Sequence, residues 1–356
     1  MVFNCKELKK VLDEKNSSEN WRGIYIWGAY EKSDSVVATL INLGGYPIVG
    51  YIDRKAPTLS EYNNIPVYSF ETLSEGNCFV FVALNRYDKQ IERTLYEYGY
   101  EEWKDYWYPY KDIHLDGTRN YQDKYGNLVV TKNSTPIDVV VRNGGVVKIE
   151  TEKLNSSLVI RSYDMSCIEI GRGNRFDGDC SITASNGTIR IGEKNVFNYR
   201  CGFRTTCKGE INIGNMCTIG RESSLVSSLN AKIVVEDDCM MSYAVELRAG
   251  NSHNIIDLDT LENLDNNKHR DVILGQHIWV GMRSVLLNGV DIGSGSMVGA
   301  NSMVVKKKYP NNVLIAGNPA RILRNYIAWI RDSDDVYLDY DCYSEAVFDE
   351  YHNVIE

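Results

Sequence analysis

A histidine with polar neighbours makes the stretch from Arg248 to Asp257 the strongest candidate for chemistry. A neutral imidazole accepts a proton near pH 7, so His253 is predicted to act as a general base. Asp257, or a backbone carbonyl, would orient the ring. Arg248 and Asn251 precede the histidine and are expected to contact the substrate. The alternative is an ordinary histidine on a surface loop, but the position of His253 in the repeat favours catalysis.

Other histidines and cysteines give weaker signals. His277 lies in a turn before Trp279, where a structural role, or a role in supporting the residues of the site, is favoured. A zinc site would need three histidines, and His253, His269 and His277 lack the usual ligand spacing. The nine cysteines contain no C-x-x-C pair, which predicts reduced, mostly buried thiols and no metal site. Cys239 as an acyl-carrying nucleophile has no supporting histidine motif.

A six-residue repeat between Ile170 and Val304 must position these residues. Large apolar residues recur every six positions in five runs, a period that fits neither an α-helix nor an alternating strand. The eighteen repeat positions are Ile170, Phe176, Ile182, Ile191, Phe197, Phe203, Ile213, Ile219, Leu225, Val235, Met241, Leu247, Leu274, Val280, Leu286, Ile292, Val298 and Val304. Each hexapeptide is interpreted as a short strand and a turn, with three hexapeptides per triangular coil. The repeat therefore predicts an all-β, left-handed parallel β-helix.

The residues between the repeat positions predict the turns and one long loop. Glycine often follows a repeat position, as at Gly192 and Gly281. Because glycine is favoured where the chain turns through positive φ, these glycines are expected to form the turns. The one large step, from Leu247 to Leu274, puts about twenty-one residues outside the coil. Long loops in compact domains are usually functional or disordered, and this loop carries His253.

Residues 1–120 follow a different pattern and are expected to form a Rossmann-like α/β domain. Strands are predicted at 24–28, 46–53, 66–68 and 78–84, and helices at 33–43 and 87–98. Gly28 closes the first strand and Asp53 ends the second, as in dinucleotide-binding proteins. The further glycines of G-x-G-x-x-G are missing after Gly28. A docking or positioning domain is therefore favoured over a site for a cofactor or a sugar nucleotide.

Residues 121–320 are assigned to the β-helix domain. Residues 321–356 are expected to form a short C-terminal helix, at 321–331, and an acidic tail. The net charge is −9 and the isoelectric point about 5.3. Nucleic acids and anionic membranes usually require a broad basic face, so neither is an expected partner. No run reaches about 18 apolar residues, and the N-terminus lacks an apolar signal core. We therefore expect a cytoplasmic protein without membrane insertion.

Several motifs resemble those of one known family. The chain resembles the hexapeptide-repeat acetyltransferases that O-acetylate sugars of bacterial capsule and lipopolysaccharide. The resemblance is carried, in the family's order, by the segments 235–241, 248–257, 277–281, 299–302 and 316–321. It covers about residues 168–325. Residues 1–120 are similar, more loosely, to the small Rossmann-like domain that precedes the β-helix in some sugar acetyltransferases.

The resemblance implies an acetyl-CoA-dependent O-acetyltransferase in which His253 is the general base and a carbohydrate hydroxyl is the acceptor. The coenzyme-binding residues that it implies are Trp279, Gly281, Ala300, Lys306 and Arg321. The tryptophan would pack on the pantetheine arm or the substrate, the two small residues would present backbone groups, and the two cations would meet the phosphates. Val305 stands where a threonine often precedes the lysine, which puts one side-chain contact in doubt. The implied assembly is a homotrimer with coenzyme A between neighbours.

Three alternatives stay open. A sugar-nucleotide N-acetyltransferase would use the same fold and donor with an amine acceptor. A zinc-dependent β-helix protein would need three histidine ligands, whereas no metal is otherwise expected. A non-catalytic scaffold would leave His253 without a role.

Overall fold

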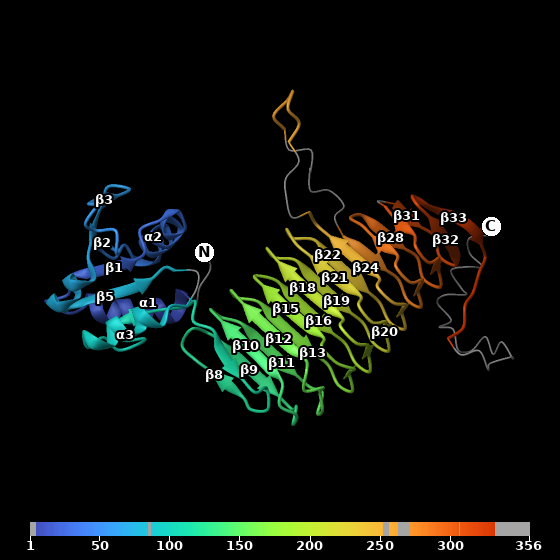
Figure 1. Ribbon diagram of the computed structural model, residues 1–356, viewed down its shortest axis with the longest axis horizontal. Coiled ribbons are helices and arrows are strands. Elements are labelled where there is room, and N and C mark those ends of the chain that lie inside the picture. Colours follow the sequence, from blue (N-terminus) through green and yellow to red (C-terminus); the bar gives the residue numbers. More distant parts are fainter. Residues whose placement is uncertain (1–4, 85–86, 252–255, 263–270, 306, 332–356) are drawn as a thin grey trace. The chain divides into compact units, whose positions relative to one another are not determined.

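The computed structural model describes residues 5–84, 87–251, 256–262, 271–305 and 307–331. The chain divides into two compact units, both drawn in Figure 1. We call them the N-terminal unit (Met1–Ile113, Gln122–Leu128 and Val141–Gly145) and the solenoid unit (His114–Tyr121, Val129–Val140 and Val146–Glu356). Across the described residues, no helix has both the length and the apolar character needed to cross a membrane.

A six-stranded sheet forms the centre of the N-terminal unit, in the order β3-β4-β2-β1-β5-β6. All neighbours pair in parallel except β3, which is antiparallel to β4. Strand β5 is buried at every position, as expected of a parallel strand covered on both faces. The elements are α1 (Cys5–Asn16), β1 (Gly23–Trp27), α2 (Glu31–Gly44), β2 (Ile48–Ile52), β3 (Glu61–Tyr62), β4 (Ile65–Tyr68), the 3₁₀ helix η1 (Phe70–Glu75), β5 (Cys78–Val82), α3 (Lys89–Glu97) and β6 (Tyr106–Trp107).

Two side chains form hydrogen bonds to backbone groups near the turn after β1. The Asp53 carboxylate accepts a hydrogen bond from the Ala29 amide at 3.0 Å. The Tyr30 hydroxyl donates to the carbonyl oxygen of Ala83 at 2.7 Å. Tyr30 occupies the position of the second glycine in the dinucleotide-binding fingerprint. In that fingerprint the glycine lets a pyrophosphate approach the backbone. Asp53 supports the connection between β1 and α2.

The solenoid unit consists of stacked three-strand coils whose strands form three sheets, of 9, 10 and 8 strands. We call these sheets faces I, II and III. Face I contains β7 (Ile113–Leu115), β10 (Asp138–Arg142), β12 (Val159–Tyr163), β15 (Ser181–Ser185), β18 (Gly202–Thr206), β21 (Ser224–Ser227), β24 (Glu246–Ala249), β27 (Val285–Leu286) and β30 (Met303–Val304). Face II contains β8 (Tyr121–Gln122), β9 (Leu128–Thr131), β11 (Val146–Ile149), β13 (Cys167–Ile170), β16 (Thr188–Ile191), β19 (Glu210–Ile213), β22 (Lys232–Val235), β25 (Val272–Leu274), β28 (Val290–Ile292) and β31 (Lys307–Tyr309). Face III contains β14 (Arg175–Phe176), β17 (Val196–Phe197), β20 (Thr218–Ile219), β23 (Met240–Met241), β26 (Trp279–Val280), β29 (Met297–Val298), β32 (Val313–Gly317) and β33 (Ala320–Asn325).

The eighteen repeat positions form the core of this unit. All of them are buried, and none is more than 4% exposed. They stack in parallel register, as in the face I column that joins Ile182, Phe203, Leu225 and Leu247. Each coil therefore adds one apolar side chain to each of three internal columns, and the predicted parallel β-helix is confirmed.

The reason expected for the glycines was wrong. Gly192 and Gly281 are not in the left-handed region of φ. Instead, a Cβ at Gly192 would lie 2.5 Å from the carbonyl oxygen of Gly214, at the equivalent position of the next coil. The positive φ falls two residues later, on residues such as Lys194 (58°) and Met216 (57°). Glycine is needed at these positions because stacked corners approach closely.

The C-terminal helix predicted at 321–331 was also wrong. Residues Ala320–Asn325 form β33, which pairs antiparallel with β32 at the end of face III. The last coil leaves an edge of unpaired backbone groups, and a hairpin satisfies them where a helix would not. The segment Tyr326–Arg331, which we call the C-terminal strap, contains no helix either.

Candidate active site

The predicted catalytic segment leaves the β-helix at the corner between faces I and II, between β24 and β25. Gly250 has a φ of 82°, and a Cβ there would lie 2.2 Å from the carbonyl oxygen of Ser228. Only glycine fits this exit. The next residue, Asn251, accepts a hydrogen bond from Asn288 Nδ2 at 2.7 Å. The corners of the preceding and following coils therefore fix the point from which the loop departs.

His253 lies outside the described residues, so its role as a general base stays a prediction. Asp257 is described, and it caps a turn within the loop. Its Oδ1 accepts hydrogen bonds from the backbone amides of Asp259 and Thr260, each at 2.9 Å. These bonds hold the pKa of the Asp257 carboxyl below its ordinary value. The structure gives Asp257 a local role, and its predicted contact with His253 stays a prediction.

Arg248 lies on β24, the strand that leads into this loop. Its side chain is exposed on the outside of face I and contacts Glu246 on the same strand, with Nε 2.5 Å from Oε1. Exposed pairs of this kind contribute little to stability. The arginine is therefore free to exchange this partner for an anionic or hydroxylated ligand at modest cost.

Three of the predicted coenzyme contacts lie on a different corner, between faces III and I. Gly281 and Ala300 follow β26 and β29, which are neighbours on face III. Arg321 on β33 is paired with Ala316, on the next strand β32. A Cβ at Gly281 would lie 2.5 Å from the backbone nitrogen of Ala300, so these corners stack closely. Ala300 and Arg321 are exposed, which makes this corner accessible to a ligand.

The other two predicted coenzyme contacts are placed differently. Trp279 begins β26 and is half-buried on the outside of face III, where its ring lies 5.9 Å from that of Trp329 in the C-terminal strap. Lys306 lies outside the described residues. The strands on either side of it, β30 and β31, belong to faces I and II. Two residues after Lys306, the ammonium group of Lys308 lies 3.4 Å from Asp291 Oδ2.

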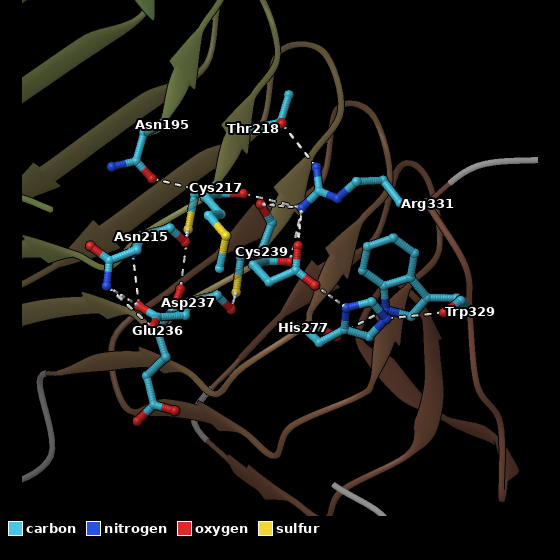
Figure 2. A network of polar contacts seen from close by, with 12 residues as sticks. Asn195, Asn215, Cys217, Thr218, Glu236, Asp237, Cys239, His277, Trp329 and Arg331 are labelled. Carbon is cyan, nitrogen blue, oxygen red and sulfur yellow. Dashed lines mark hydrogen bonds and ion pairs between the residues drawn. The ribbon is translucent and has the colours of Figure 1, made fainter. Parts of the chain in front are cut away.

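The sequence did not indicate a network at the corner between faces II and III, which Figure 2 shows from close by. His277 Nδ1 lies 2.6 Å from Asp238 Oδ2, and Nε2 lies 3.0 Å from the carbonyl oxygen of Trp329. The imidazole ring of His277 stacks on the indole ring of Trp329, with the ring centroids 4.0 Å apart and 9° between the ring planes. Trp329 Nε1 in turn donates to the carbonyl oxygen of His277 at 2.9 Å. Each ring nitrogen of His277 is therefore occupied by an oxygen partner.

Arg331 extends this network to earlier coils. Its guanidinium donates to Asp238 Oδ1 at 2.7 Å and to Thr218 Oγ1 at 2.9 Å. Burial opposes ionisation of Asp238, but the contacts with His277 and Arg331 outweigh it and lower the pKa of the carboxyl. The strap thus ties three coils together along their outside. This confirms the structural role predicted for His277, although nothing in residues 326–331 marked them as its partners.

The remaining sulfur and metal hypotheses gain no support. Cys239 is 1% exposed, and burial raises its pKa well above the ordinary thiol value, which is the opposite of an activated nucleophile. The His277 ring nitrogens both face oxygen acceptors, so neither presents a lone pair to zinc. Within the ranges that the structure describes, no cluster of three histidine, cysteine or acidic side chains is arranged to hold a metal ion; His253 and His269 lie outside those ranges.

Part of the chain is similar in sequence to known proteins. The chain is 34% identical over 119 residues to a polysialic acid O-acetyltransferase of Escherichia coli O1:K1 / APEC, a match covering 33% of this chain and 38% of that protein. It is 35% identical over 109 residues to a putative lipopolysaccharide biosynthesis O-acetyl transferase of Escherichia coli strain K12, covering 31% of this chain and 50% of that protein. The chain thus spans at most half the length of these two relatives.

Among solved structures, the polySia-specific acetyltransferase NeuO aligns with 64% of this chain and 86% of its own, at 24% identity and a TM-score of 0.43. No family model matches the chain. The sequence matches therefore concern a part of the chain and leave the activity of the whole protein to be proposed.

Proposed function

We propose that this protein is an acetyl-CoA-dependent O-acetyltransferase that acts on a sugar hydroxyl of a bacterial surface polysaccharide or its precursor. The observation that carries the proposal is the arrangement of successive coils. They combine a corner of small residues, at the buried Gly281 and the exposed Ala300, with a fixed exit at Gly250 to the loop whose sequence contains His253. The partial similarity to polysialic acid and lipopolysaccharide O-acetyltransferases supports the same chemistry.

The proposed reaction is direct transfer. The acceptor hydroxyl oxygen attacks the thioester carbonyl of acetyl-CoA while His253 removes its proton. A carbon–oxygen ester bond forms and the carbon–sulfur bond breaks. His253 then returns the proton to the departing thiolate, so the enzyme ends in its starting state. A base of this kind typically contributes about 10²–10⁴-fold. Trp279, Gly281, Ala300, Lys306 and Arg321 would hold the donor.

The distance between the loop exit at Gly250 and the proposed donor corner at Gly281 supports a homotrimer whose sites are shared between neighbouring copies. Within one chain, Gly250 and Gly281 lie at opposite edges of face I. A strand rises about 3.3 Å per residue, so four residues of β24 separate those edges by about 13 Å. A neighbouring copy that brings its loop to the donor corner would complete the site. We place the protein in the cytoplasm, where acetyl-CoA is available.

The test is a screen of acceptors in which turnover is measured as the release of free thiol from acetyl-CoA. Hydroxyl-bearing oligosaccharides should support turnover, whereas the matching amino sugars should gain no N-acetyl group. Preferential acetylation of an amine would favour the sugar-nucleotide N-acetyltransferase alternative. Absence of thiol release with every acceptor would contradict the proposed activity.

For the shared site, His253→Ala and Ala300→Trp copies should each be inactive alone. Mixed under conditions that exchange subunits, they should recover activity, because some interfaces would combine an intact loop with an intact corner. No recovery in mixed assemblies would place each site within a single chain.

A further inference from the structure

Arginine and tyrosine side chains form a stripe along the solenoid, on face I and the adjoining corner with face III. We call it the arginine track, and it consists of Tyr199, Arg200, Arg204, Arg221, Tyr243, Arg248 and Arg283. From this stripe we infer that the acceptor is an anionic glycan, whose carboxylate-bearing sugars lie along the track. The inference rests on the proposed function for the reaction, but the binding that it predicts does not require turnover.

Register aligns the members of the track from one coil to the next. The backbone amide of Glu222 donates to the carbonyl oxygen of Tyr199, and that of Ala244 donates to Arg221, each at 2.9 Å. The corner residues Tyr199, Arg221 and Tyr243 therefore stack in successive coils. Neighbouring parallel strands lie about 4.8 Å apart, which is comparable to one sugar unit of an extended glycan.

The corner arginines are held against aromatic rings. The Arg200 guanidinium lies 4.8 Å from the centroid of the Tyr199 ring, and that of Arg221 lies 4.7 Å from the Tyr243 ring. The two tyrosines are 41% and 50% exposed. Stacking restrains a planar guanidinium while leaving its edge open to a carboxylate. An exposed tyrosine also offers an apolar face to a sugar ring and a hydroxyl for hydrogen bonds.

Beside the corner, face I is nearly flat. Its first outward column contains Ser181, Gly202 and Ser224, which pair in register across β15, β18 and β21. A Cβ at Gly202 would meet nothing closer than Ser181 Oγ, at 3.7 Å. Small residues leave room above this column for a bound chain. The next outward column aligns Arg204, Val226 and Arg248, and β24 then leads to the exit at Gly250.

The charge of the track differs from that of the rest of the solenoid. On face II, Lys148 and Arg190 both pair with Glu169, at 2.7 and 3.2 Å. By contrast, no carboxylate among the described residues lies within ion-pair distance of Arg200, Arg204 or Arg221. A chain of net charge −9 therefore carries three arginines on this stripe without a carboxylate at ion-pair distance, while Arg248 contacts Glu246. Arginine binds carboxylates in a bidentate manner, so this stripe fits a polyanionic glycan.

Binding can be measured on the full chain by isothermal titration without acetyl-CoA. The probes are a galacturonic acid hexamer, its neutral methyl ester, and a hexamer of α2,8-linked sialic acid. We expect one or both acidic hexamers to bind and the ester to bind at least about tenfold more weakly. Affinity should fall as salt rises, since exposed charges are screened over about 8 Å at physiological ionic strength.

Substitutions test whether the track is the binding surface. The double variant Arg204→Ala/Arg221→Ala should weaken binding of the acidic hexamer about tenfold or more. The double variant Arg204→Glu/Arg221→Glu should bind it more weakly still. The double variant Arg204→Lys/Arg221→Lys should have an affinity between those of the original protein and the alanine variant. The matched control is Lys148→Ala/Arg190→Ala on face II, which also removes two positive charges and should not change affinity. Light scattering and thermal unfolding should show the same assembly and stability for every variant.

Several outcomes would overturn the inference. Equal binding of the acidic hexamers and the ester would show that charge is not recognised. Equal loss in Lys148→Ala/Arg190→Ala would show a non-specific field effect. Tight binding of a DNA oligomer of the same charge would show a general polyanion surface. A change of assembly in Arg204→Ala/Arg221→Ala would assign the stripe to a subunit interface. If the hexamer binds as expected but no acceptor is acetylated, the proposed reaction fails while the track stands.

Discussion

Two corners of the same coil use the chain very differently. Between β25 and β26 the chain turns through residues 275–278, and His277 at that corner contacts Asp238 and the strap through both ring nitrogens. Between β24 and β25 the chain leaves the coil for residues 250–271, which include His253. The shared apolar columns continue through both corners without a break. The β-helix can therefore extend one corner without changing the core.

The comparison also separates two uses of an imidazole. His277 has an oxygen partner at both ring nitrogens and stacks on Trp329, so neither nitrogen is open to a substrate. A general base needs a neutral ring with one free nitrogen. The proposed general base is therefore chosen by where His253 lies in the repeat, in addition to its residue type. The following predictions test this contrast between the structural histidine, His277, and the proposed catalytic histidine, His253.

The largest expected effect follows from removing the base. His253→Ala should lower kcat for acetyl transfer about 10²–10⁴-fold and leave the free energy of unfolding nearly unchanged. His277→Ala should leave kcat nearly unchanged and lower the free energy of unfolding, because it removes the contact between the imidazole and Asp238 Oδ2. Steady-state kinetics and chemical denaturation measure the two effects. Retention of full activity by His253→Ala would remove the basis of the mechanism.

The next effect concerns the strap. Trp329 is 5% exposed, and truncating a buried tryptophan typically costs about 3–5 kcal/mol. Trp329→Ala should therefore detach the C-terminal strap, seen as faster hydrogen exchange at residues 326–331 with the core still protected. Ile330→Ala, at a side chain that is 38% exposed, is the control on the same segment. Unchanged exchange in the tryptophan variant would mean that the stacking contributes little.

A smaller effect is expected at the root of the loop. Gly250→Ala places a Cβ 2.2 Å from a carbonyl oxygen at a φ of 82°, so we expect a loss of about 1–3 kcal/mol from backbone strain. Gly202→Ala is the matched control, since a Cβ there has free space. Thermal unfolding compares the two alanine variants. Equal stability would show that the exit can relax at no cost.

The smallest effect is a dependence on pH. The pKa of Asp238 is lowered in the folded protein, so its ion pairs stabilise the strap at neutral pH and above the ordinary aspartate value of 3.8. This contribution is lost as pH falls through the lowered pKa. Tryptophan fluorescence should therefore report release of the strap below about pH 4. The Asp238→Asn variant should release it over a wider pH range and lack this transition.

The sequence predicted the repeat better than the surface. All eighteen apolar positions were identified because burial imposes residue type directly, and their spacing located the loop exit. The C-terminal strand was missed because the edge of β32 determines it, a long-range contact that local pattern does not contain. The arginine track was missed for a related reason. Arg200 and Arg221 are neighbours in space but twenty-one residues apart in the chain, so no local cluster of charge announces them.

The stacking of coils has a further consequence for how such a protein can evolve. Each coil contacts chiefly its two neighbours, so a coil can be gained or lost on the N-terminal side without disturbing the corner where the loop leaves. Every coil added there would lengthen the outer stripe by about 4.8 Å. The number of coils would then act as a ruler, setting how many sugar units are grasped before the one that reacts.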